Sequence, residues 1–241
     1  MKKSTLIVLF LAFASQFFAQ KTLTELSVTY TIKDVKIKGG GKNAMAGKAM
    51  ENSNIQITSK NGQSKMNMDM MNGMIKMQMF MNSKTNSSNM FMSMMGQNIE
   101  MVGIDSIQKH QKANPDTSKL KTSKPVATGK KKKILDYDCD EYLTTSIIKG
   151  KKSTTSMYVA KAIKADKSVF ENSDQMQMLP SMSGGGGIEG FPLEMSIDSD
   201  EMTMTMQATA IEDEVEDKEF IMPTGYKKVN MKDMGKMKGG F

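Results

Sequence analysis

The 241-residue sequence contains no tryptophan and no arginine, and it has a single cysteine, Cys139, and a single histidine, His110. One cysteine excludes a disulfide framework, and one cysteine with one histidine excludes a multi-Cys/His zinc site. A catalytic triad would have to recruit His110, the only imidazole. Without arginine and tryptophan, bidentate phosphate recognition and strong base stacking lose their usual residues. The composition therefore predicts a protein that is not an enzyme, with no cofactor and no Cys/His metal site.

Lysine and methionine are what the chain has in excess. All 33 basic residues are lysine, against 26 acidic residues, and the formal net charge is +7. The lysine run at 130–133 lies next to an acidic run at 136–141, which favours a solvated loop over a nucleic-acid surface. Methionine contributes 28 residues, so its role decides how the chain is interpreted.

The first 20 residues have the layout of a secretory signal peptide. Lys2 and Lys3 precede an apolar run over residues 6–19, which is shorter than the roughly 20 apolar residues that a spanning helix needs. We expect cleavage after Ala19 and export to the periplasm or the cell surface. No later stretch is long and apolar enough to predict a transmembrane helix.

Alternation of apolar and polar residues with period two dominates the remaining chain. It occurs at 28–32 and 55–57, and methionine supplies the apolar positions at 66–70, 77–81 and 202–206. Such alternation predicts strands with one buried and one wet face.

Two Asn-Gly pairs, at 61–62 and 72–73, separate neighbouring strands and predict tight hairpin turns. Further strands are expected at 89–95, 98–104, 134–145, 153–160, 192–198 and 201–211. The predicted fold class is mainly β (α+β), with one antiparallel sheet of nine to eleven strands.

Three segments interrupt the strands. Residues 39–50 are Gly-rich and indicate a connection, and residues 105–128 indicate a long surface loop. In 161–180, Phe170 and Met178 are compatible with a short helix that covers one open side of the sheet.

The sequence gives no sign of a second domain. The 105–128 loop divides the strands into two groups, each too small and too one-faced to fold alone. We predict a signal peptide at 1–19, one domain at 20–228 and a flexible tail at 229–241.

The alternating methionines are the candidate ligand site. Methionine is flexible and polarizable, and surfaces built from it adapt to irregular apolar partners. They predict a deformable cavity for an acyl chain, covered by Phe170 and Met178. Two other interpretations stay open: a filled core in a structural or interaction module, and a thioether site for Cu(I) or Ag(I). The nine residues are Met66, Met68, Met70, Met77, Met79, Met81, Met202, Met204 and Met206.

The remaining candidate sites are weak. Equal-parity methionines on one strand lie almost 7 Å apart, so a metal site needs thioethers from adjacent strands or loops. Cys139 lies between carboxylates that raise a thiol's pKa, which predicts a packed and unreactive residue. The run at 136–141 resembles the start of a calcium loop, but Glu141 and Ile147 stand where a glycine and a bidentate glutamate are required. His110 has no flanking ligands.

One stretch resembles a known family. The sequence GKKKKILDYDCDEY at 129–142 is similar to the Gly-Lys…Ile-Leu-Gly-Tyr-x-Cys-x-x-Tyr segment of the exported bacterial domain-of-unknown-function family 4412, with Asp136 in place of the usual glycine. MYV at 157–159, FPLEM at 191–195 and FIMPTGY at 220–226 follow in the expected order.

That family is similar to the LolA-like lipoprotein-carrier superfamily, which implies a single curved antiparallel sheet forming a half-open β-barrel with a short helical cover and a lipid-accepting cavity. The resemblance implies no catalytic residues. We therefore expect a non-enzymatic envelope protein that carries or senses a lipid or lipoprotein acyl chain. A ligand-free structural or interaction module with an envelope protein partner is the alternative.

Overall fold

The computed structural model describes residues 21–38, 47–48, 50–85, 87–94, 96–102, 121–148, 150–165 and 188–230. These ranges are mostly β-strand, with a short 3-10 helix, η4 (Asp217–Phe220). None of the helices in these ranges has the length and apolarity needed to cross a membrane. The predicted signal peptide, the cover residues Phe170 and Met178, and His110 lie outside the described residues.

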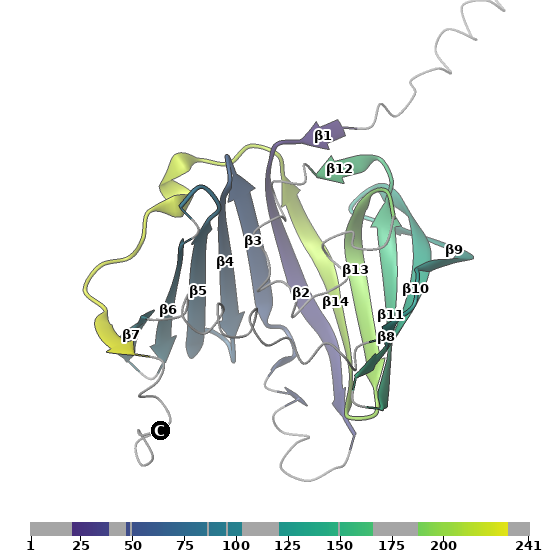
Figure 1. Cartoon of the computed structure of the whole chain (residues 1–241), viewed down its shortest axis with the longest axis horizontal. Helices are drawn as coiled ribbons and strands as arrows, with labels where there is room; N and C mark the ends of the chain where they lie inside the picture. Colours follow the sequence, from purple (N-terminus) through teal and green to yellow (C-terminus); the bar gives the residue numbers. More distant parts are fainter. Residues whose placement is uncertain are drawn as a thin grey trace, which may run out of the picture.

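Thirteen of the described strands form one sheet, and β1 and β12 form a separate parallel pair (Figure 1). In chain order the strands are β1 (Lys21–Leu23), β2 (Glu25–Ile37), β3 (Asn54–Lys60), β4 (Gln63–Met70), β5 (Ile75–Asn82), β6 (Ser87–Met94), β7 (Gln97–Val102), β8 (Lys121–Thr122), β9 (Val126–Ile134), β10 (Tyr137–Ile148), β11 (Lys151–Ala160), β12 (Ile163–Ala165), β13 (Phe191–Ser199), β14 (Met202–Glu212) and β15 (Lys227–Asn230).

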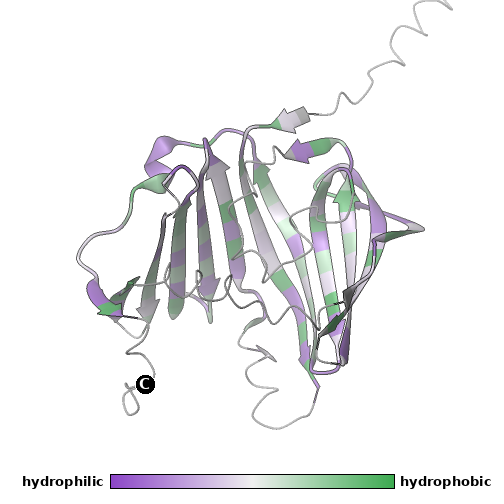
Figure 2. Cartoon of the chain, viewed as in Figure 1, coloured by the Kyte–Doolittle hydropathy of each residue, from purple (hydrophilic) through white to green (hydrophobic). Residues whose placement is uncertain are grey.

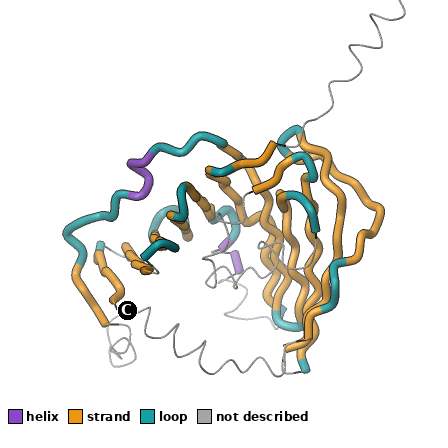
Figure 3. The backbone as a smooth tube through the Cα atoms, turned by 45° about the horizontal axis from the view of Figure 1, so that its top comes forward, coloured by secondary structure: helices purple, strands orange, loops and turns teal. Residues whose placement is uncertain are grey.

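The sheet has the order β15-β7-β6-β5-β4-β3-β2-β14-β13-β11-β10-β8, and β9 also pairs with β10. Strands β2 to β7 form an antiparallel meander, and β14 joins β2 to the later strands. Seen from its upper edge, the sheet follows a curved path (Figure 3). Its end strands do not pair with each other within the described ranges, so no closed barrel forms there. The prediction of one curved, mainly antiparallel sheet is confirmed.

Turn chemistry explains the meander. Asn61 and Gly62 both have positive φ, 52° and 78°, and connect Lys60 directly to Gln63. Two consecutive positive φ angles are typical of a type I′ turn, whose twist matches the flanking strands. The predicted hairpin at 61–62 is confirmed. The second Asn-Gly pair lies in the middle of a four-residue turn, 71–74, between β4 and β5.

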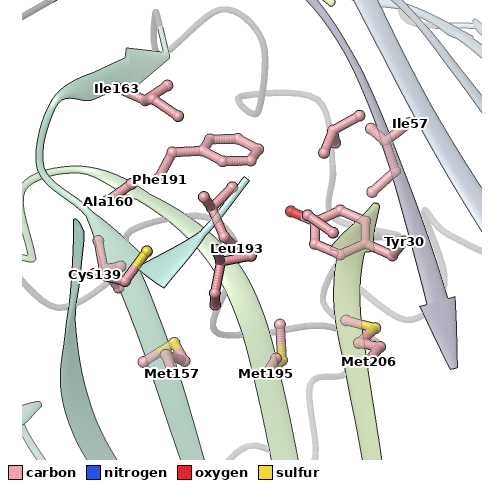
Figure 4. Packing of buried hydrophobic residues seen from close by; sticks show 14 of the residues in the cluster. Tyr30, Ile57, Cys139, Met157, Ala160, Ile163, Phe191, Leu193, Met195 and Met206 are labelled. Carbon is pink, nitrogen blue, oxygen red and sulfur yellow. The ribbon is translucent and has the colours of Figure 1, made fainter. Parts of the chain in front are cut away.

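The largest core lies where β2, β14, β13 and β11 meet (Figure 4). Leu193 and Phe191 are 0% and 1% exposed, and Tyr30 is 1% exposed. The Tyr30 hydroxyl donates a 2.8 Å hydrogen bond to the carbonyl oxygen of Pro192, and burial raises the pKa of the phenol. Figure 2 shows the apolar and polar bands that alternate along the strands around this core.

The expected strand at 134–145 is interrupted by a turn. Leu135 and Asp136 have φ angles of 47° and 66°, and the chain reverses there between β9 and β10. The lysine run at 130–133, predicted as a loop, belongs to β9, and part of the predicted 105–128 loop forms β8 and the start of β9. Both predictions were wrong because β9 has no apolar alternation. The strand is held by its pairing with β10.

Two further expectations need correction. Ile163 lies in the segment 161–180, where a short helix was expected, but it begins strand β12, which pairs in parallel with β1. The tail was predicted to be flexible from residue 229, but Val229 lies in β15, parallel to β7, and is 7% exposed against Met101. The sheet also has more strands than the nine to eleven expected. Both β12 and β15 are held in place by pairing with a strand that is far away in the sequence.

Candidate functional site

The register of the sheet brings methionines from neighbouring strands opposite one another. Directly paired residues of adjacent strands lie on the same face, and the pairings extend across the meander in two rows. The first row is Val28, Ile57, Met66, Met79, Met90, Met101 and Val229. The second row is Tyr30, Ile55, Met68, Met77, Met92 and Ile99. We call this side of the sheet the methionine face.

The other predicted methionines lie on the same face. Met70 pairs with Ile75 at the end of β4, and Met81 pairs with Ser64. On β14, Met206 pairs with Ile32, which follows Tyr30 by two residues along β2. Met204 and Met202 continue the same alternation opposite Val35 and Ile37. The strands β2 and β3 separate these three from the methionines of β4.

The nine residues differ in burial. Met206 is 1% exposed and belongs to the main core, whereas Met79 and Met81 are 6% and 8% exposed. The others are partly buried, and three of these pack against the main core: Met66, Met68 and Met204. Burial therefore varies from strand to strand: all three methionines of β4 are partly accessible, whereas β5 and β14 each carry both buried and partly buried methionines.

Sequence reasoning missed several methionines of this face. Met90, Met92 and Met94 alternate within a strand that had been predicted at 89–95 and carry the rows into β6. Two core methionines, Met157 and Met195, form with Met206 a row across β11, β13 and β14 (Figure 4). The alternation of Met90 to Met94 was a signal that could have been used.

The opposite face of the meander carries amides and aromatic rings. Gln78 donates to the Asn67 side chain at 3.3 Å, and Asn67 donates to Gln56 at 3.0 Å. The rings of Phe80 and Phe91 pack edge to face, with centroids 5.7 Å apart.

The segment before β15 packs on this opposite face. The Tyr226 ring lies edge to face on Phe91, with centroids 5.3 Å apart. Lys65 Nζ donates to Glu219 Oε2 of η4 at 3.1 Å. The aromatic rings of the opposite face thus already have a partner.

A small cavity lies near the β3–β4 turn. Its volume is about 60 Å³, and Ser64, Phe80, Met81 and Met222 are among the residues that line it. This volume is enough for a few water molecules and too small for an acyl chain. A chain-like ligand would therefore have to lie along the methionine face rather than in this cavity.

The charged side chains of β9 are paired. Glu141, 6% exposed, accepts hydrogen bonds from Thr128 Oγ1 at 2.6 Å and Ser156 Oγ at 2.8 Å. These bonds and the nearby Lys130 ammonium hold the pKa of the Glu141 carboxyl below its ordinary range, against the opposing effect of burial. The four lysine–carboxylate pairs are Lys130–Glu141, Lys131–Asp140, Lys132–Glu194 and Lys133–Asp136. The basic run is thus neutralised rather than presented as a bare patch.

Cys139 is packed, as predicted. It is 1% exposed, and burial raises the pKa of its thiol to about 11, with smaller contributions from Asp138 and Asp140. The thiol is therefore protonated at neutral pH. Among the described residues, no three His, Cys, Asp or Glu side chains come together as a metal site.

Comparisons with known proteins give one family and several distant structures. The family model described as Domain of unknown function (DUF4412) matches residues 42–226. No curated protein matches the chain. The structure of PNGF-II is similar at 10% identity and a TM-score of 0.41, covering 88% of this chain and 32% of that one. LprF from Mycobacterium bovis is similar at 11% identity and a TM-score of 0.38, covering 84% of this chain and 90% of that one. The chain thus spans about a third of the length of the PNGF-II chain.

Proposed function

The chain belongs to the DUF4412 family, and we propose that it is a non-enzymatic, exported envelope protein that binds a lipid or lipoprotein acyl chain on its methionine face. The resemblance stated from the sequence motifs is thereby confirmed at the level of the family. In this proposal the curved sheet is a half-open barrel.

One observation carries the proposal: the two methionine-rich rows run unbroken across the meander. The first row crosses seven strands, and at about 4.8 Å per strand spacing it extends about 29 Å. This length accommodates an extended hydrocarbon chain. Ten methylenes withdrawn from water at about 0.8 kcal/mol each contribute about 8 kcal/mol, which corresponds to a Kd of about 1 µM before ordering costs.

The choice of methionine supports a ligand of variable shape. A β-branched residue has few rotamers on a strand, whereas methionine has three rotatable bonds and a polarizable sulfur. Four of the central row members, Met66, Met68, Met77 and Met90, are partly buried rather than sealed. Met77 and Met90, which do not pack against the main core, can therefore change rotamer to follow an acyl chain without disturbing it.

The non-enzymatic part of the proposal follows from the composition and from Cys139. The chain has one cysteine, one histidine and no arginine. The Cys139 thiol is buried and its pKa is raised to about 11, which disfavours a nucleophile. The export part rests on the signal-like residues 1–19 and places the protein in the periplasm or at the cell surface.

A titration with a fluorescent fatty acid tests acyl binding. The full chain without its signal peptide should bind the probe, and Met68→Gln/Met77→Gln/Met90→Gln should raise the probe Kd at least tenfold, because glutamine has similar length but a polar end. Met71→Gln/Met74→Gln is the matched control, since these residues are 39% and 56% exposed in the β4–β5 turn. Circular dichroism verifies that both variants fold.

Native mass spectrometry of protein purified without detergent supplies an independent readout. A co-purified lipid mass supports the proposal. Consistently bare protein, together with no probe binding by the unaltered chain, would refute it.

The second candidate is a structural or interaction module without a ligand. It is favoured by the tight packing of Met157, Met195 and Met206, which are 1–3% exposed in the main core. If the interior is equally filled at β4 to β6, the unaltered chain will not bind the probe, and this candidate then takes the place of the first.

A further inference from the structure

Six methionines of the methionine face form a compact array on three adjacent strands. Each of β4, β5 and β6 contributes two of them, and each methionine is paired directly with one on the next strand. They are Met66, Met68, Met77, Met79, Met90 and Met92, and we call them the methionine grid. The register thus supplies what two methionines of one strand cannot: thioethers that face each other from neighbouring strands.

The spacing of the grid suits a single small ion. Opposite residues of antiparallel strands have their β-carbons about 4.5–5.5 Å apart, against almost 7 Å along a strand. Met77 and Met79 on the middle strand each have a methionine on both sides. Because the methionine side chain is long and unbranched, sulfur atoms from three strands can converge above β5.

The partly buried grid methionines leave room for an ion to enter. Once bound among the buried ones, the ion would lose most of its hydrating water. Met79 and Met92 are buried, at 6% and 9% exposure, whereas the other four grid members are partly buried. Thioethers are soft, neutral donors that select Cu(I) over hard cations such as Mg²⁺ or Ca²⁺. A monovalent ion adds one charge to the face, which costs less to desolvate than a divalent ion.

We propose that the methionine grid binds one monovalent soft metal ion, Cu(I) or Ag(I), through thioether sulfurs of β4, β5 and β6. The site goes beyond acyl binding and does not depend on it, because it requires sulfur rather than apolar volume. Replacing methionine by leucine separates the two: leucine keeps an apolar side chain of similar size but supplies no metal ligand.

Silver ion is the first probe, because it needs no reducing agent. Silver nitrate is titrated into chain labelled with ¹³C at the methionine methyl groups. The grid methyl resonances should shift together and saturate at one equivalent, while those of Met71 and Met74 in the exposed turn should stay in place. Shifts spread evenly over all methionines, or no shifts, would overturn the proposal.

Leucine variants provide the second test. In competition with a chromogenic Cu(I) chelator under anaerobic, reducing conditions, Met77→Leu/Met79→Leu/Met90→Leu/Met92→Leu should weaken Cu(I) binding at least tenfold. The control Met71→Leu/Met74→Leu should bind as the unaltered chain does. If the fourfold variant fails to fold, the single variants Met77→Leu and Met92→Leu should each weaken binding measurably. Unchanged Cu(I) affinity in the folded variants would contradict the site.

The two proposals fail in different ways. The fourfold leucine variant should keep its affinity for the fluorescent fatty acid while losing Cu(I). Fatty-acid binding without metal binding in the unaltered chain removes only the grid as a metal site. Metal binding without fatty-acid binding removes only the acyl proposal.

Discussion

The two halves of the sheet bury their inner faces with different kinds of side chain. In what we call the core half, strands β2, β14, β13, β11 and β10, the interior is built from β-branched, aromatic and leucine residues together with methionine. Leu193, Ala160 and Phe191 are at most 1% exposed there. In the methionine half, strands β4 to β7 and β15, the buried methionines keep 6–9% exposure.

The halves also differ on the opposite face. Behind the core half, the buried carboxylates Glu141 and Glu194 accept hydrogen bonds from Ser156 and Gln207 at 2.8 Å and 2.7 Å. Behind the methionine half, neutral amides carry the cross-strand hydrogen bonds, from Gln78 through Asn67. The core half therefore has stiff side chains in front and buried carboxylates behind. The methionine half has flexible side chains in front, and amides with the Lys65–Glu219 ion pair behind.

Under the acyl-binding proposal, this difference assigns stability to one half of the sheet and ligand binding to the other. Residues with few rotamers define the core half, where a change in volume leaves a void because the neighbours cannot move. Methionines define the other half, where neighbours can fill a gap or surround a ligand. In that proposal the core half is the rigid scaffold, and the methionine half is the adaptable binding face.

The largest expected effect is a difference in stability when one inward-facing side chain in each half is shortened to alanine. Leu193→Ala should lower the free energy of unfolding by about 3 kcal/mol, because the side chain is 0% exposed and its removal leaves a cavity. Met77→Ala should cost about 1 kcal/mol, because the side chain is only partly buried and its neighbours are flexible. Urea denaturation of both variants at neutral pH measures the difference. Equal losses would mean that the methionine half is packed as tightly as the core half.

The methionine half was largely predictable from the sequence, because its signals are local. Alternation at 66–70 and 77–81 and the Asn-Gly turn at 61–62 determine which residues share a face and which strands pair. Tertiary information was needed only at the edge, where β15 adds in parallel to β7.

The core half and its neighbouring strands β9 and β12 were less predictable, because these strands are defined by distant partners. Strand β9 is polar along most of its length and is held by its ladder with β10 and by lysine–carboxylate pairs. The turn at Leu135 and Asp136 contains no glycine, so it gave no turn signal. Ile163 is apolar in a short segment, and only its pairing with β1 makes that segment a strand.

The second expected effect tests how tightly the core half is closed at the start of β13. Gly190 has a φ of 122°, and a Cβ atom there would lie 2.7 Å from the Ala160 carbonyl oxygen and 2.8 Å from Val159 Cγ1. Gly190→Ala should therefore destabilise the protein by about 2 kcal/mol. Thermal and urea unfolding measure the loss.

Gly96 provides the matched position in the methionine half. It also has a positive φ, 78°, but a Cβ atom would meet nothing within 4 Å. Gly96→Ala should cost about 1 kcal/mol, which is the backbone term alone. If both alanine variants lose the same amount of stability, movement of neighbouring residues relieves the close approach at Gly190, and the core half is not rigid at this position.

The smallest expected effect is a dependence of stability on pH, and it compares the buried carboxylate Glu141 behind the core half with the amide Gln78 behind the methionine half. The folded-state pKa of Glu141 is lowered, chiefly by its hydrogen bond from Thr128. A lowered carboxyl pKa contributes stability above the unfolded-state pKa, and that contribution disappears as pH falls through the folded-state value. Glu141→Gln should thus lower the free energy of unfolding by about 1 kcal/mol at pH 7, and the difference from the unaltered chain should shrink as the pH falls below about 4.3.

Gln78→Ala is the control for that pH dependence, because it removes an amide of the methionine half that carries no charge. Its effect on the free energy of unfolding should be the same at pH 7 and at acidic pH, since neither Gln78 nor its partner Asn67 titrates. Urea denaturation at a series of pH values gives both profiles in one experiment. A constant difference for Glu141→Gln would show that the buried carboxylate acts through its shape and hydrogen bonds alone. A pH-dependent difference for Gln78→Ala would contradict this contrast between the halves, because it would mean that the stabilising effect of the Gln78 amide depends on the charge of a titrating group.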